Sequence, residues 1–177
     1  MHTQSSPFGA LGSRGPCYRC GGRGCAQCRW VARRTESREA VRRQAFADAR
    51  IVPTDADLAW GAGLFEGEGT ITMHPNGTPY VIVGNTDHQV IDFFCRHWPG
   101  CVTVHNPANV NQNAREAWDW RIGGWKALLF LREMRPHFRT DRVIGKTVLV
   151  LDAGGLPHAQ RREHVARIRV LNRRGLR

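Results

Sequence analysis

One stretch decides the fold of this chain: Trp60-Gly61-Ala62-Gly63-Leu64-Phe65-Glu66-Gly67-Glu68-Gly69-Thr70-Ile71. Ala59, Gly63 and Gly67 recur every fourth residue, so a helix here carries small side chains along one face. Such a stripe lets a second helix approach backbone to backbone. Glu66 and Glu68 then stand at the end of the helix. The simplest interpretation is an ordinary helix that ends in a glycine cap and exposes two solvated glutamates.

The segments on both sides of this stretch predict alternating helices and strands. Pro53 interrupts the preceding segment, and Thr54 or Asp55 is placed to cap a new helix. We expect helices over residues 57–65, 87–98, 125–135, 140–152 and 158–173, strands over 70–74, 80–83, 101–105 and 117–122, and a turn over 75–78. The expected class is α+β, with an α-β-β-α-β-β-α core and a basic helix after it.

The stretch over 60–71 resembles the signature of the LAGLIDADG homing endonucleases, followed by the first strand of that family. Ala62-Gly63-Leu64 match the signature, and Phe65 replaces an isoleucine. Glu66 and Glu68 take its two acidic positions. Gly61 stands where the signature has a leucine, which is a departure.

Two further segments carry the same resemblance, which covers roughly residues 54–152. Val83-Gly84-Asn85-Thr86-Asp87 resembles the family's I-x-N-T-D stretch, and residues 131–142 (LREMRPHFRTDR) resemble its helix–P-Y-L-R-x-K–helix junction. Asp141 takes the position at which that junction has a lysine. This departure bears on cleavage more than on the fold.

The resemblance implies a homing-endonuclease-like fold with a saddle-shaped antiparallel sheet and two signature helices packed together. The last acid of each helix then lies beside its twin and next to DNA, where carboxylates can hold Mg²⁺. Paired metals activate water and stabilise the leaving oxygen in phosphodiester cleavage. The catalytic residues implied are Glu68, as the Mg²⁺ ligand, with Glu66, Asn85, Arg139, Arg142 and Lys146.

A single copy of the signature, with no internal repeat, supplies one active acid of each kind. Two are needed, so the sequence predicts a homodimer with Ala59, Gly63 and Gly67 at its interface. Alternation along the strands, in which Trp118, Trp120 and Ile122 share one face, leaves the opposite face to DNA. The expected DNA contacts of the sheet are Thr70, Thr72, His74, Thr103, His105 and Arg121, each of which is otherwise an ordinary solvated strand residue.

Charge is placed unevenly around a formal net charge of +11. Residues 1–50 hold ten arginines against three acidic residues, and residues 153–177 hold seven arginines against one glutamate. The middle of the chain is nearly neutral. Basic arms of this kind can neutralise phosphates, so double-stranded DNA is the expected partner, contacted through Arg33, Arg34, Arg173 and Arg174. A basic surface without a specific partner is the alternative.

Four cysteines, Cys17, Cys20, Cys25 and Cys28, form two Cys-x-x-Cys pairs. Each pair can place two thiolates on one tetrahedral ion, so we expect a structural Zn²⁺ knuckle. Unligated thiols and a redox pair are the alternatives. CYRCGGRG resembles one zinc-binding repeat of the J-protein chaperones, but that family uses several repeats, so chaperone function does not carry over. Cys95 and Cys101 stand in apolar contexts and are expected in the core.

The expected organisation is a disordered tail over 1–16, a zinc knuckle over 17–28, a basic linker or solvated helix over 29–50, an endonuclease domain over 51–152 and a basic helix over 153–177. No apolar run reaches the roughly 20 residues of a membrane span. No apolar signal-peptide core is present near the N-terminus, so a cytoplasmic protein is expected.

Three functions fit these features to different degrees. The first is a site-specific, Mg²⁺-dependent double-strand DNA endonuclease. The second is a DNA- or RNA-binding regulator or maturase that keeps the fold without cutting. The third, a zinc-knuckle adaptor, leaves the acidic stretch without a role.

Overall fold

The computed structural model describes residues 25–105 and 116–173, and contacts divide the chain into two units, 1–48 and 49–177. Helix α1 (Ala26–Ala49) makes up the described part of the first unit. Its side chains are exposed on every side along most of its length. The sequence predicted a basic linker or a solvated helix over 29–50, and the structure has a helix over Ala26–Ala49. A helix whose described side chains are mostly exposed depends on solvent or a partner rather than on a core.

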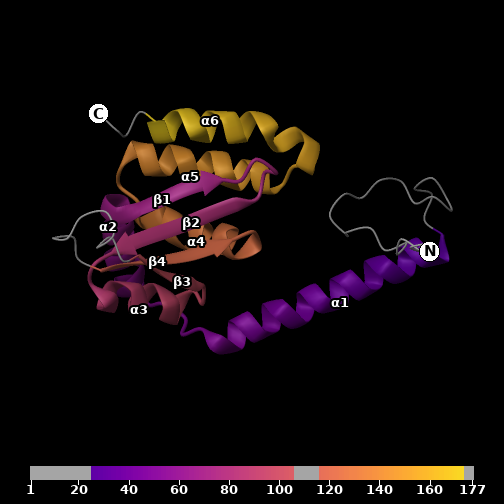
Figure 1. Ribbon diagram of the computed structural model, residues 1–177, viewed down its shortest axis with the longest axis horizontal. Helices are drawn as coiled ribbons and strands as arrows, with labels where there is room; N and C mark the ends of the chain where they lie inside the picture. The colour runs from indigo at the N-terminus through magenta and orange to yellow at the C-terminus, as the bar shows by residue number, and fades with distance from the viewer. Residues whose placement is uncertain (1–24, 106–115, 174–177) are drawn as a thin grey trace, which may run out of the picture. The chain divides into compact units, whose positions relative to one another are not determined.

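The second unit has the expected order of elements and is α+β, as predicted. The helices are α2 (Asp55–Glu68), α3 (His88–His97), α4 (Trp125–Met134), α5 (Asp141–Gly154) and α6 (Arg162–Arg173), with short 3-10 turns η2 (Arg135–His137) and η3 (His158–Arg161). The strands are β1 (Gly69–Met73), β2 (Pro79–Asn85), β3 (Cys101–His105) and β4 (Ala117–Gly123). Figure 1 shows α5 and α6 side by side next to β1.

The four described strands form one antiparallel sheet in the order β1-β2-β4-β3. Alternate residues divide it into two faces, as the sequence pattern predicted. One face is buried against α2, α3 and α4 and carries Ile71, Met73, Val81, Val83, Trp120 and Ile122. The opposite face carries exposed Thr70 and Arg121. The described helices therefore leave one side of the sheet open.

Aromatic side chains fill the space between the sheet and the helices. Phe130 of α4 lies at the centre, with ring centroids 5.1 Å from Phe65, 5.0 Å from Trp98 and 5.5 Å from Trp120. All four side chains are fully buried. Because Phe65 belongs to α2, this cluster fixes the deciding stretch against the rest of the core.

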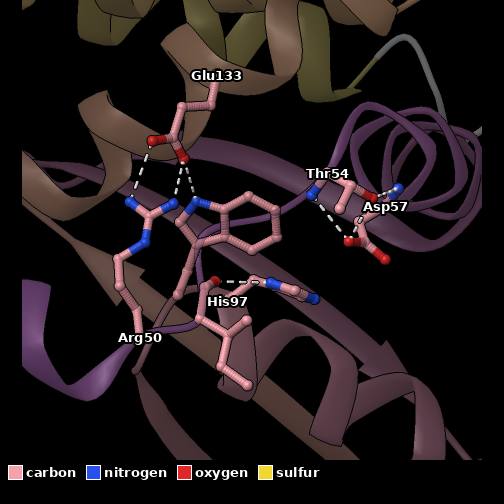
Figure 2. A network of polar contacts seen from close by, with 7 residues as sticks. Arg50, Thr54, Asp57, His97 and Glu133 are labelled. Atoms are coloured by element: carbon pink, nitrogen blue, oxygen red, sulfur yellow. Dashed lines mark hydrogen bonds and ion pairs between the residues drawn. The ribbon is translucent and has the colours of Figure 1, made fainter.

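The chain enters α2 through a network of polar contacts (Figure 2). The Glu133 carboxylate accepts two hydrogen bonds from the buried Arg50 guanidinium, at 3.1 and 3.0 Å, and one from Trp98 Nε1 at 2.7 Å. His97 Nδ1 lies 2.8 Å from the carbonyl oxygen of Ile51. A bidentate arginine–carboxylate pair holds both partners in one geometry. The start of the second unit is thus fixed to α3 and α4.

The N-terminus of α2 is capped by Thr54, one of the two residues expected to do so. Thr54 Oγ1 accepts a hydrogen bond from the backbone N–H of Asp57 at 3.2 Å, and the Asp57 carboxylate accepts one from the backbone N–H of Thr54 at 2.8 Å. This reciprocal capping box satisfies two backbone donors. Hydrogen bonds from the Thr54 hydroxyl and backbone hold the pKa of Asp57 below its ordinary value.

Cys101 does not lie in the core, so that expectation was wrong, while Cys95 is half-buried. β3 is at the edge of the described sheet, and Cys101 pairs in register with exposed Arg121. An apolar sequence context cannot distinguish an edge strand from a central one. The expected continuous helix over 158–173 is also interrupted, because it begins as the 3-10 turn η3 before α6.

Candidate functional site

Gly61, which departs from the LAGLIDADG signature that this segment resembles, lies where α2 packs closely on its neighbours. A Cβ atom at this position would meet the end of Met134 at 2.8 Å and the ring of Phe93 at 2.9 Å. Ala62 and Phe65 are fully buried on the same side of the helix. A leucine therefore has no room at position 61 between α3 and α4.

The small-residue stripe faces away from this packing. Ala59, Gly63 and Gly67 are all exposed. A Cβ atom added to Gly63 or Gly67 would find no atom within 4 Å. Within the described residues, this side of α2 is consequently open, and Trp60 at its edge is 51% exposed.

Glu66 connects α2 to the start of α5. Its Oε1 accepts hydrogen bonds from the backbone N–H groups of Arg139 at 2.7 Å and Thr140 at 2.6 Å, and from the Thr140 hydroxyl at 3.0 Å. Partial burial by itself raises the pKa of Glu66, but these hydrogen bonds and the charge of Arg139 outweigh it, and the pKa lies below its ordinary value. The ionised carboxylate therefore holds two segments far apart in sequence.

Glu68 is the last residue of α2 and is exposed. The structure gives its carboxylate no hydrogen bond or ion pair with another described side chain, in contrast to Glu66. The next residue, Gly69, begins β1 and pairs in register with Val83 of β2. The carboxylate of Glu68 thus stands where the helix meets the sheet, available to a cation.

Asn85 and Asp87 build the connection from β2 to α3. Asn85 Oδ1 accepts a hydrogen bond from the backbone N–H of Asp87 at 2.8 Å, and the Asp87 carboxylate caps α3 by accepting one from Gln89 at 2.9 Å. The N-T-D segment thus forms a turn and a helix cap. The hydrogen-bonding oxygen of Asn85 is occupied locally.

The basic residues expected in the site differ in exposure. Arg139 and Arg142 are exposed, whereas Lys146 is 7% exposed on the buried side of α5. Burial, and next the nearby charge of Arg142, lower the pKa of Lys146 below its ordinary value. Asp141, where the resemblance leads to the expectation of a lysine, is an exposed acid in the first turn of α5, where the helix dipole favours a negative charge.

The open face of the sheet carries most of the residues expected to contact DNA. Thr70, Ile82, Arg121 and Cys101 form one row across the four strands, and Thr103 pairs with Asp119 in the next. Thr72 lies on the same side of β1, and His105 pairs in register with Ala117. His74 lies in the turn after β1, where its Nδ1 accepts a hydrogen bond from the backbone of Asn76. The sheet thus brings together residues that are spread over 52 positions of the chain.

Metal ligands are not gathered within any one described region. Residues 25–105 and 116–173 contain no group of three or more His, Cys, Asp or Glu side chains arranged to hold an ion. Cys17 and Cys20 lie outside the described residues, as does Arg174. Cys25 directly precedes α1 and Cys28 lies in its first turn. Arg33 and Arg34 of α1 and Arg173 at the end of α6 are exposed.

Sequence reasoning missed the part played by Thr140. This residue donates to Glu66 from both its backbone and its hydroxyl group. Its place directly before α5 is typical of a helix N-cap, which was the available signal. Its long-range partner had no such signal, because the two residues are 74 positions apart.

None of the described helices is long and apolar enough to cross a lipid bilayer. No protein-family model matches the chain, and no curated protein sequence matches it.

Proposed function

We propose that this protein is a site-specific, divalent-metal-dependent endonuclease that cuts both strands of DNA as a homodimer. The observation that carries the proposal is the end of α2. There, Glu68 is exposed, its neighbour Glu66 is committed to α5, and an open stripe of small residues runs along the same helix. One helix therefore combines a carboxylate available to a cation with a surface suited to close helix packing.

Homodimerisation explains how a single such helix makes a complete site. Two copies packed through Ala59, Gly63 and Gly67 would bring their Glu68 residues close together by symmetry. Exposed glycines without atoms around their Cβ positions suit this contact, because a second helix can fill the space. A partially exposed Trp60 at the edge of the stripe adds an apolar anchor for the second copy.

The carboxylate oxygens of Glu68 are suitable ligands for Mg²⁺, because Mg²⁺ prefers carboxylate oxygens and retains several waters. A single chain supplies too few ligands in its described part. Glu68 of each copy, together with phosphate oxygens and water, would complete the coordination. The bound metal would supply Lewis-acid activation of water and stabilisation of the leaving oxygen.

The remaining residues of the proposed site hold its segments in place, supply positive charge or exchange protons. Glu66 holds the start of α5 against α2, so the basic groups of α5 keep a defined relation to the end of α2. Lys146, with its lowered pKa, gives up a proton more readily than an ordinary lysine and is our candidate for proton exchange with water at the scissile phosphate. Arg139 and Arg142 would balance phosphate charge, and Asn85 would keep the β2–α3 turn in place.

Duplex DNA would lie on the open face of the sheet. Thr70, Thr72, Thr103 and Arg121 project from this face and can reach base edges, with His74 directly after β1 and His105 as the last residue of β3. Arg33, Arg34, Arg173 and Arg174 would contact phosphates. In this proposal the outer face of the sheet recognises DNA, while the inner face forms part of the hydrophobic core.

The test uses the full-length protein, a library of duplex DNA and Mg²⁺, with sequencing of the cut ends. We expect double-strand cuts at a restricted set of near-palindromic sites, lost on chelation of the metal. Glu68→Gln should keep duplex binding and lose cutting, because it keeps the shape and removes the charge. Glu163→Gln, an exposed glutamate on α6, makes the same change in net charge and should cut normally. Cutting by Glu68→Gln at the wild-type rate would contradict the proposed mechanism.

A non-cleaving DNA- or RNA-binding regulator is the second candidate. Asp141 favours it, because this acid replaces the lysine of the family's junction. Wild-type protein that binds a defined duplex or RNA, but cuts nothing in Mg²⁺ or Mn²⁺, would establish this function instead.

We also propose a structural Zn²⁺ bound by Cys17, Cys20, Cys25 and Cys28. Elemental analysis should find about one zinc per chain, as for a closed four-cysteine site. Replacing Cys17 and Cys20 by serine should remove the metal and leave the unit 49–177 folded. Zinc retained by that variant would exclude this ligand set.

A further inference from the structure

Helix α6 presents a row of exposed arginines along one of its sides. Arg162, Arg169 and Arg173 stand at positions i, i+7 and i+11, which return to the same side of an α-helix. All three are exposed, and the structure gives none of them an ion pair with a described residue. Ala166 lies between them, so no large side chain interrupts the row. At about 1.5 Å per residue the row is about 16 Å long.

The adjacent side of α6 is fixed to the protein. Val165 and Ile168 are buried at 5% and 0% exposure, and α6 packs against both α5 and β1. The Asn172 side-chain amide donates to the carbonyl oxygen of Ile71 in the edge strand β1, at 3.1 Å. Arg161, just before the helix, donates to the carbonyl oxygens of Leu156 and Gly77. The helix is therefore held in place, and the direction of its arginine row is set by the fold.

The chemistry of this surface selects its partner. Glu163 is the only acidic residue of α6, so the row is not neutralised from within the helix. A basic helix that binds an anionic membrane inserts an exposed apolar face between lipids. The apolar face of α6 is already buried, and Val170, at 47% exposure, is its one large exposed apolar side chain. A row of positive charges about 16 Å long, without an apolar face beside it, suits the phosphates of a nucleic-acid backbone.

We infer that Arg162, Arg169 and Arg173 form a phosphate-backbone contact surface for double-stranded DNA, separate from the outer face of the sheet. The inference rests on the proposed function only for the identity of the polyanion. Contacts to phosphates position a duplex without reading its sequence. The row therefore strengthens binding to every duplex equally and leaves the choice of site to the sheet.

The test measures duplex affinity of the full-length protein against salt concentration, in the absence of divalent metal. Each arginine that neutralises a phosphate contributes about 0.9 to the slope of log affinity against log salt. Replacing Arg162, Arg169 and Arg173 together by alanine should lower the absolute slope by up to about 2.7, equally for duplexes of unrelated sequence. Circular dichroism and thermal melting check that the variant is folded.

The matched control replaces Arg96, Arg132 and Arg135, which are exposed on or next to α3 and α4. It makes the same change in net charge and should leave the slope within about 1 of the wild type. An unchanged slope in the α6 variant, or an equal loss in the control, would overturn the inference. So would loss of binding to vesicles of anionic lipid with unchanged duplex affinity. A protein that binds duplexes with the expected slope but never cuts them would refute the nuclease and keep this surface.

Discussion

The two sides of α2 differ in a way that the sequence does not display. Both are rich in small residues, with Gly61 and Ala62 on one side and Ala59, Gly63 and Gly67 on the other. On the first side, a Cβ atom at Gly61 would lie within 3 Å of Met134 and Phe93. On the second, a Cβ atom at Gly63 would touch nothing within 4 Å. One glycine is required by the fold, and the other is available to a partner.

This difference teaches that small residues in a helix have two separate uses. Tight packing within one chain and tight packing between two copies of the chain require the same residue types, because both bring backbones close together. Only the surroundings of each residue distinguish them. Substitutions on one side of α2 at a time test that distinction.

The largest effect on stability should come from Phe65 on the inner side. Its ring lies 5.1 Å from that of Phe130 and 5.6 Å from that of Phe138, and it is fully buried. Phe65→Ala should lower the free energy of unfolding by about 3–5 kcal/mol, because it leaves a cavity in the aromatic cluster. Urea unfolding followed by tryptophan fluorescence measures this. A loss below about 1 kcal/mol would mean that α2 is not packed as described.

Gly61→Leu should have the second largest effect. The new side chain must displace both Met134 and Phe93, and overpacking of this kind typically costs about 1–3 kcal/mol. Gly61→Ala is a milder control, because the flexible end of Met134 can move aside. The two variants should therefore lose stability in that order in the same unfolding experiment. Equal stability of Gly61→Leu and wild type would show that position 61 tolerates the family's leucine.

Gly63→Leu should change the stability of the monomer by less than Gly61→Leu does, and it should raise the free energy of unfolding rather than lower it. Leucine favours helix over glycine by up to about 1 kcal/mol, and the position is open. Unfolding is measured at a concentration where both proteins are monomeric. The same variant should fail to dimerise in analytical ultracentrifugation and should lose double-strand cutting, because the interface requires a close approach. Dimers of Gly63→Leu with wild-type affinity would remove α2 from the proposed interface.

The smallest effect should come from Glu66, which lies between the two sides. Its pKa is lowered from 4.5, so its carboxylate stabilises the fold above the pKa of the unfolded chain. That contribution is lost as the pH falls below about 4.5 and through the folded pKa. Glu66→Gln should therefore be less stable than wild type at pH 7, and the difference should shrink at acidic pH. Solvent screening keeps the difference near or below about 1 kcal/mol. A difference that grows as the pH falls would contradict this assignment.

Local sequence patterns predicted much of the secondary structure of this protein. The order of helices and strands, the cap at Thr54 and the two faces of β4 follow from spacing and composition, because these features depend on residues a few positions apart. The small-residue stripe and the two glutamates of α2 were likewise evident as candidates. Several element ends moved by one to three residues, as with α2, which runs to Glu68 rather than Phe65, and α6 begins four residues later than expected.

The surroundings of each candidate residue depend on contacts in the folded protein. Glu66 is held by residues 73 and 74 positions away, while Glu68, two residues further on, is exposed without a described partner. Lys146 is buried because of what packs on α5, and the arginine row of α6 has its direction because Asn172 and Ile168 fix that helix to the core. Contacts between distant segments set burial, hydrogen-bond partners and pKa. A sequence lists the groups that can make these contacts but does not state which of them meet.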